Sequence, residues 1–201
     1  MHNEVVSFIN SKVSGANATL NTPENGDSSV SIDASKILEV CQALKDGEFE
    51  FNVLQVISGV DYKEYLELVY ILASFTKNTE LLLKVKLDRG TEENLPSVDS
   101  VTSVWSAANW QEREAYDMIG VRFNNHPDHR RILTPDDWEG YPLRKDYVVQ
   151  EKYHDMVVNP EAKVNTADHM FMKNLKESYP DPKKVSGSWK SDDGDAAEAK
   201  E

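Results

Sequence analysis

Arginine and tryptophan are concentrated in one stretch of this sequence. Five of the six arginines and three of the four tryptophans lie between residues 105 and 144. A guanidinium makes bidentate, charge-assisted hydrogen bonds, and an indole fills a large pocket while keeping one donor. Both residue types are enriched where protein interfaces concentrate their binding energy. The stretch therefore indicates either contact with another polypeptide or a surface helix and loop that carry many ion pairs.

Two carboxylates of this stretch could in principle act as acid and base. Glu114 and Asp117 are one helical turn apart. Arg113 stands four residues before Asp117 and can pair with it, and a neighbouring cation keeps a carboxylate ionised. Ion-pair networks of this kind are more often structural than catalytic. We therefore expect no catalytic residue here.

The sequence His-Pro-Asp-His could offer ligands to a divalent metal ion. His126, Asp128 and His129 supply two imidazoles and a carboxylate. Pro127 prevents the regular helix that would aim both rings to one side, and no third strong ligand stands at a telling spacing. We expect instead loop histidines that bond the backbone or a partner carboxylate. A metal-dependent hydrolase that uses these residues is kept as an alternative.

Sequence motifs for common cofactors are missing. No pair of glycines has GxG spacing, and neither GxxxxGK nor GxSxG occurs. The single cysteine, Cys41, excludes an internal disulfide, a cysteine-rich zinc site and an all-cysteine iron–sulfur cluster held by this chain alone. We expect Cys41 on the buried side of a helix, no cofactor or metal in this chain, and a binding module rather than an enzyme.

An α+β body is predicted upstream of this stretch. Helical spacing of apolar residues predicts one helix that Asp33 can cap and Gly47 ends, and a second helix that Gly120 ends. Three β-like runs predict an antiparallel sheet with the helices packed against one face. The predicted elements are a short helix at 4–13, a loop or hairpin turn at 14–29, a short strand at 30–32, helices at 33–46 and 105–119, and strands at 49–57, 64–75 and 80–87. The side chains expected on the covered face are Leu66, Leu68, Tyr70, Leu72, Leu81, Leu83, Val85 and Leu87.

The predicted backbone changes character after residue 120. Prolines at 127, 135 and 142 exclude a long helix and a central strand, and leave about 25 residues irregular. Irregular segments of this length are usually functional or lie against another molecule. We therefore divide the chain into an N-terminal helix and loop (1–29), the α+β domain (30–120), an extended interface arm (121–150) and a polar C-terminal tail (151–201). In the tail we expect the last dozen residues to be disordered, and Met170, Phe171 and Leu175 to anchor one turn on a partner.

The net charge limits the possible partners. Thirty-five acidic against 22 basic side chains give a formal charge of −13, which disfavours binding to nucleic acid or to anionic lipid. No apolar run approaches the ~18–20 residues that span a bilayer. Residues 1–20 contain no arginine and no long apolar core, unlike a secretory signal or a mitochondrial presequence. We expect a cytoplasmic chain whose membrane contact is peripheral.

The segment from Trp110 to Tyr147 resembles the C subunit of the proton-pumping NADH:quinone oxidoreductase, respiratory complex I. That family's signature runs E-R-E-x-x-D-M-x-G-x-x-F, then H-P-x-x-R-R-I-L, then D-W-E-G-x-P-L-R-K-D-Y. Two positions depart from it, because His129 stands where an aliphatic residue is usual and Thr134 where leucine is frequent. The residues that match in place are Glu112, Arg113, Glu114, Asp117, Gly120, Phe123, His126, Pro127, Arg130, Arg131, Asp136, Trp138, Gly140, Pro142, Arg144, Lys145 and Asp146.

The resemblance covers roughly residues 28–150 and implies a non-catalytic subunit of the complex's peripheral arm. It implies that FMN and the iron–sulfur clusters lie in partner subunits, and that the neighbours are the D subunit, with the quinone site, and the cluster-carrying B and I subunits. It also implies a peripheral place on the cytoplasmic side of the cell inner membrane. We expect Arg130, Arg131 and Arg144 to pair with carboxylates of the D subunit. The full set of expected interface residues is Trp110, Arg113, Arg130, Arg131, Trp138, Arg144 and Lys145.

A second reading gives the chain a different electron donor. A homologous subunit of a membrane-bound [NiFe] hydrogenase or formate hydrogenlyase would share the body and the arm. The intact D-W-E-G-x-P-L-R-K-D-Y segment favours the quinone-reducing complex.

Overall fold

The structure is a computed structural model that describes residues 1–91 and 94–158. The chain forms two compact units, Met1–Val148 and Val149–Glu201. The predicted arm therefore contributes residues 121–148 to the first unit. The tail residues named above, Met170, Phe171 and Leu175, and the expected disorder of the last dozen residues lie outside the described part of the chain.

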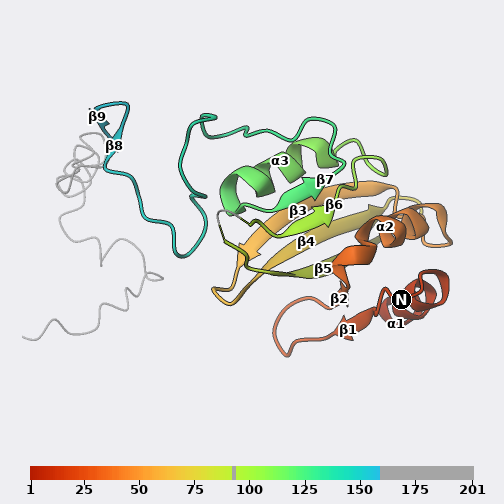
Figure 1. The fold of residues 1–201 in the computed structure, drawn as a ribbon. Helices are drawn as coiled ribbons and strands as arrows, with labels where there is room; N and C mark the ends of the chain where they lie inside the picture. The colour runs from red at the N-terminus through yellow and green to blue at the C-terminus, as the bar shows by residue number, and fades with distance from the viewer. Residues whose placement is uncertain (92–93, 159–201) are drawn as a thin grey trace, which may run out of the picture. The chain divides into compact units, whose positions relative to one another are not determined.

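A mixed five-stranded sheet is the centre of the first unit, and its strand order is β1-β2-β5-β4-β3 (Figure 1). The three longest strands pair antiparallel in sequence order, as predicted. The pairing of β2 with β5, about which the sequence pattern made no prediction, is parallel. The chain passes through a helix between β2 and β3, so β2 arrives beside β5 in the same direction. The strands are β1 (Thr19–Asn21), β2 (Ser29–Ile32), β3 (Val53–Asp61), β4 (Tyr65–Ser74) and β5 (Thr79–Asp88).

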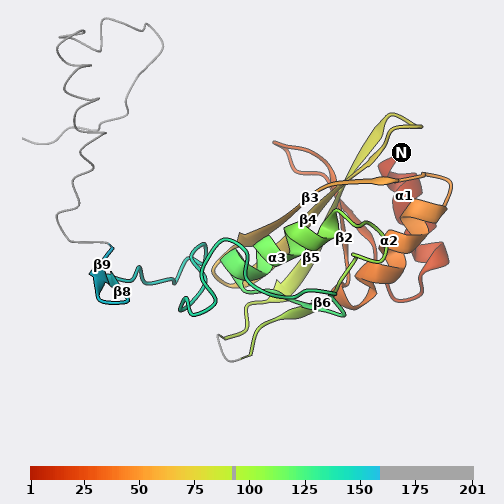
Figure 2. The same cartoon turned by 90° about the horizontal axis from the view of Figure 1, so that it is seen from above.

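One face of this sheet is covered by α2 (Ile37–Asp46) and α3 (Ala108–Ile119), as Figure 2 shows. Period-two alternation places every second side chain of β4 and β5 on the covered face. The predicted face is confirmed, because its members are at most 6% exposed. Together with apolar side chains of the helices they form one buried cluster, so the fold is α+β as expected. These strand residues are Leu66, Leu68, Tyr70, Leu72, Leu81, Leu83, Val85 and Leu87.

The N-terminal residues belong to the same buried cluster. Helix α1 (His2–Lys12) buries Val5 and Ile9, and β1 forms an antiparallel hairpin with β2. Asp33 differs from its predicted role, because its carboxylate accepts a hydrogen bond from Asn17 Nδ2 and caps no backbone N–H. A 3₁₀ turn, η1 (Ala34–Lys36), comes between Asp33 and α2.

The second half of the body is built around α3. A parallel pair, β6 (Ser97–Asp99) and β7 (Arg122–Asn124), brackets this helix in sequence. The predicted end of the helix is confirmed at Gly120, which adopts the left-handed conformation with a φ of 76°. A Cβ at this position would stand 2.7 Å from the ring of Tyr141. Both the left-handed backbone and the closeness of this ring therefore require glycine.

The outer edge of the sheet, β3, is irregular. Its register with β4 shifts between Leu54 and Val56, which marks a bulge. The side-chain amide of Gln111, on α3, donates to the carbonyl of Gln55 at 3.1 Å. The opposite edge strand, β1, has only three residues. Both edges therefore offer few regular hydrogen-bonding sites to a further strand.

The described part of the second unit is short. It contains an antiparallel hairpin of β8 (Lys152–Tyr153) and β9 (Met156–Val157). No helix among residues 1–91 and 94–158 is long and apolar enough to cross a membrane.

Candidate partner interface

Asp117 joins α3 to the arm. Its Oδ2 accepts three consecutive backbone N–H groups, those of Ile132, Leu133 and Thr134, at 3.0, 2.7 and 2.9 Å. Its Oδ1 accepts from Arg131 Nη1 at 2.8 Å and from the hydroxyl of Thr134. Burial by itself raises the pKa of this carboxyl, but the hydrogen bonds from the arm outweigh it and lower the pKa to about 2. One side chain thus fixes the course of four residues of the arm.

Arg131 and Arg144 point into the body, and both lie close to the ring of Tyr141. Besides Asp117, Arg131 donates to the carbonyl of Gly140 at 3.0 Å. Arg144 donates to the last carbonyls of α3 and its C-cap, Ile119 O at 2.6 Å and Gly120 O at 3.2 Å. The two guanidinium carbons lie 5.2 and 5.0 Å from the centre of the Tyr141 ring. Each of these two guanidinium groups therefore makes several hydrogen bonds within this chain, and their pairing with carboxylates of another subunit stays a prediction.

Arg113 is also enclosed. Its side chain is 5% exposed, donates to the carbonyls of Arg130 and Arg131 at 3.2 and 3.3 Å, and lies 3.4 Å from a carboxylate oxygen of Asp128. The predicted pairing of Arg113 with Asp117 does not occur, because Asp117 is occupied by the arm. The cation packs 5.0 Å from the ring of Trp110, which extends outward from the helix.

The His-Pro-Asp-His loop is fixed by backbone hydrogen bonds, as predicted for loop histidines. His126 Nδ1 accepts the N–H of Asp128 at 3.0 Å, so its Nε2 carries the hydrogen and donates to Asn109 O at 3.1 Å. His129 Nε2 accepts the N–H of Phe123 at 3.1 Å. Burial lowers the pKa of His129. Within residues 1–91 and 94–158, no group of three His, Cys, Asp or Glu side chains is arranged to hold a metal ion.

Glu112 is a buried carboxyl to which the sequence patterns assigned no role of its own. Its oxygens accept from Ser100 Oγ at 2.6 Å and from the N–H of Val101 at 2.7 Å, and His126 Nε2 lies 3.8 Å away. Burial raises its pKa to about 7 in spite of these hydrogen bonds. Glu112 stands four residues after Ala108 and three before Ala115, on the buried stripe of α3, and this spacing was the signal that could have revealed it.

The predicted interface residues therefore fall into two groups. Trp110 is 62% exposed, the side chain of Arg130 is 68% exposed, and Lys145 is exposed as well. Arg113, Arg131 and Arg144 are turned inward, and Trp138 is half-buried. Arg130 is paired within the arm, since its Nε donates to both oxygens of Asp128 at 3.0 and 3.1 Å. Two leucines outside the predicted set, Leu133 and Leu143, are 62% and 58% exposed.

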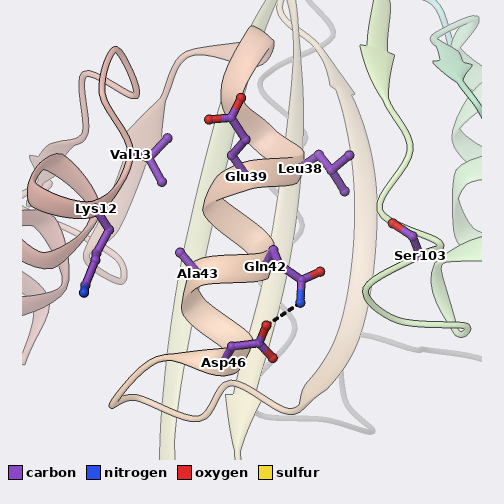
Figure 3. Close-up of a pocket in the computed structure, with 8 residues that line it drawn as sticks. All are labelled: Lys12, Val13, Leu38, Glu39, Gln42, Ala43, Asp46 and Ser103. Carbon is purple, nitrogen blue, oxygen red and sulfur yellow. Dashed lines mark hydrogen bonds between the residues drawn. The ribbon is translucent and has the colours of Figure 1, made fainter.

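The polar side chains that line a hollow beside α2 do not point toward a common centre (Figure 3). Its drawn hydrogen bond joins Gln42 and Asp46 of the same helix. Glu39 pairs with Lys36 at 2.7 Å and stands two turns from Asp46, so the carboxylates of the hollow do not converge. The hollow is lined by Lys12, Val13, Leu38, Glu39, Gln42, Ala43, Asp46 and Ser103. The cysteine nearby, Cys41, is fully buried as expected, and burial raises the pKa of its thiol.

Comparison with known proteins decides the family. The family described as respiratory-chain NADH dehydrogenase, 30 Kd subunit, matches residues 30–153. The chain belongs to this family. The match includes β3, β4, β5, nearly all of β2, α3, the Asp117 contacts and the whole arm, so the resemblance noted in the sequence is confirmed.

Relatives named as the C subunit of NADH-quinone oxidoreductase agree with this family. The one from Roseiflexus sp. (strain RS-1) is 46% identical over 125 residues, which cover 60% of this chain and 70% of the relative. The one from Geobacter sulfurreducens is 43% identical over 129 residues, 62% and 76% of the two chains. A chain from the structure of the membrane-bound sulfane sulfur reductase, an archaeal respiratory membrane complex, has a TM-score of 0.60 at 21% identity and covers 96% of this chain and 97% of its own. That likeness shows the fold.

The two departures from the family signature have structural roles here. The ring of His129 packs 4.2 Å from that of Tyr116 and accepts the Phe123 N–H. The hydroxyl of Thr134 donates to Asp117, a bond that leucine could not make. Both substitutions therefore leave the arm attached to α3.

Proposed function

We propose that this chain is a non-catalytic subunit of the peripheral arm of NADH:quinone oxidoreductase, where it holds the D subunit, with the quinone site, against the iron–sulfur B and I subunits. The single observation that carries the proposal is the family match over residues 30–153, which spans the body and the arm together. The name shared by the relatives, the C subunit of NADH-quinone oxidoreductase, supports the same role.

The chemistry of that complex belongs to partner subunits in this proposal. Electrons pass from NADH through FMN and iron–sulfur clusters to quinone, and their passage is coupled to proton translocation. The present chain contributes no cofactor. Its one cysteine is buried, and the polar groups that could act chemically, Asp117, His126 and His129, are engaged in hydrogen bonds to the arm or to the backbone. As part of the complex, the chain lies peripherally on the cytoplasmic side of the cell inner membrane.

A subunit that acts as a scaffold binds more tightly when the backbone of its contact surface is already ordered before assembly. Association costs less when fewer backbone and side-chain rotations are lost at the interface. The four hydrogen-bonded residues at Asp117 and the bonds from Arg144 to the end of α3 fix the arm on the body in this way. The body, in turn, is held by one continuous apolar cluster.

Copurification tests the proposal. The chain, tagged and expressed in its own organism, is purified in mild detergent, and mass spectrometry identifies the accompanying subunits. We expect the D, B and I subunits with FMN-binding and NADH-binding subunits, and loss of NADH:quinone reductase activity from membranes when the gene is deleted. Recovery of a nickel-containing hydrogenase subunit instead would support the alternative complex. Stoichiometric zinc or manganese in the purified chain, with hydrolase activity, would support the metal-dependent alternative.

A further inference from the structure

Exposed apolar side chains are carried by α3 and by the arm residues bonded to it. Trp110 is 62% exposed near the start of the helix. Leu133 is 62% exposed, and its N–H is held by Asp117. Leu143 is 58% exposed, and its N–H donates to the carbonyl of Met118 at 2.9 Å. Apolar groups held outward by ordered backbone are typical of an interaction surface.

The backbone contacts attach Leu133 and Leu143 to the same helix that carries Trp110. Residues 110, 114 and 118 follow one another at four-residue intervals and so form one stripe of α3. The guanidinium of Arg113 bridges from the Trp110 ring to the carbonyl of Arg131, two residues before Leu133. We call the surface formed by Trp110, Glu114, Leu133, Leu143 and Lys145 the α3–arm surface.

The charges on the α3–arm surface differ from those expected from its sequence. The arginine side chains of this segment bond other groups of the same chain, as shown for Arg131 and Arg144. Arg130 pairs with Asp128. Glu114, on the stripe between Trp110 and Met118, is exposed and forms no ion pair within the described residues. Lys145, two residues after Leu143, is exposed and forms none there either.

We propose that the α3–arm surface docks a second polypeptide of the complex, whose facing patch is apolar and places a lysine or arginine opposite Glu114 and a carboxylate opposite Lys145. Trp110, Leu133 and Leu143 fill the apolar centre. Burying a charge without a partner is strongly unfavourable, so the charges of Glu114 and Lys145 need complements across the contact. This inference rests on the proposed function and names the chemistry of its partner.

Substitutions on the surface test the apolar centre. Leu133→Asp and Leu143→Asp place an uncompensated carboxylate in that centre, and we expect at least about a tenfold loss of copurifying partner subunits for each. Phe75→Asp is the matched control, because Phe75 is 75% exposed at the turn between β4 and β5, and it should leave the yield unchanged. Circular dichroism and thermal melting check that all three variants fold.

Substitutions of Glu114 test the charge complement. Glu114→Arg should reduce copurification at least about tenfold and more than Glu114→Gln, since it adds repulsion to the loss of attraction. Glu24→Arg, at an exposed hairpin position, is its control and should have no effect.

The outcomes separate the two proposals. If the wild-type chain recovers no NADH:quinone oxidoreductase subunits, the proposed function is wrong. If the wild type recovers them and the leucine variants recover them equally, the docking surface is wrong. Equal yields for Glu114→Arg and the wild type would overturn the charge complement. A wild-type dimer in light scattering that Leu133→Asp converts to monomer would assign the surface to self-association and overturn the proposal.

Discussion

The carboxylate of Asp117 lies 2.8 Å from the guanidinium of Arg131, fourteen residues further along the chain. The same carboxylate also receives three backbone N–H groups of the arm. An ionised side chain that satisfies so many donors at once organises the arm, because its loss removes the acceptor that three consecutive backbone N–H groups share.

Asp117→Asn should detach the arm from α3. The amide replaces one acceptor oxygen with an NH₂ group that faces donors, so we expect a loss of about 2–4 kcal/mol in the free energy of unfolding. Urea denaturation measures it. Asp136→Asn, an exposed change in the same segment, should cost almost nothing, and equal losses in the two variants would contradict the special role of Asp117.

Acid should weaken the same contact. The pKa of Asp117 is lowered from 3.8 to about 2 in the folded chain, so its stabilising effect is complete above the unfolded value and disappears as the pH falls through that range. Between pH 5 and pH 2 we expect a loss of about 2 kcal/mol attributable to this group. The Asp117→Asn variant should lack that component of the pH dependence in parallel urea titrations.

Glu112 should have the opposite effect on stability. Its pKa is raised from 4.5 to about 7, so the folded chain binds more protons than the unfolded chain between these values, and stability falls as the pH rises. We expect up to about 3 kcal/mol to be lost between pH 4.5 and pH 7.5. Glu112→Gln keeps a neutral side chain of the same size and should flatten this slope. An unchanged slope in the variant would show that another group causes it.

Gly120→Ala should destabilise the end of α3. The residue has a φ of 76°, and a new Cβ would meet the Tyr141 ring at 2.7 Å, so strain and overlap add. We expect a loss of about 1–3 kcal/mol in thermal unfolding. Gly26→Ala, which also has positive φ but whose Cβ meets nothing nearer than 3.8 Å, isolates the backbone component. Similar losses for both variants would mean that the Tyr141 contact contributes little.

Arg144→Ala should free the last part of the arm without unfolding the body. The side chain binds the carbonyls of Ile119 and Gly120, which then lose their donors. We expect faster amide hydrogen exchange in residues 140–148 and unchanged exchange in β4 and β5. Arg144→Lys tests whether charge alone suffices. It should restore only part of the protection, because an ammonium cannot span both carbonyls as the guanidinium does.

The sequence predicted well where local pattern decides structure. Alternation in β4 and β5 identified the buried side chains correctly, and Gly120 marked the end of α3. The destination of the arginines could not be predicted in this way. The segment between Asp117 and Arg131 is irregular and has no periodicity, so only the tertiary fold shows that these two side chains pair with each other. The same applies to β2, whose parallel pairing with β5 depends on the path of the chain through α2, and to Asp33, whose carboxylate bonds Asn17 instead of a helix N-terminus.

The bulged β3 and the three-residue β1 have a consequence for the newly made chain. A subunit that awaits assembly is exposed to others of its kind, and open sheet edges invite intermolecular strand pairing. With the register of β3 interrupted at Leu54 and a carbonyl of that strand already bonded by Gln111, neither edge offers a long template for aggregation. The two sheet edges therefore give the unassembled chain fewer sites for edge-to-edge strand pairing than a long regular edge strand would.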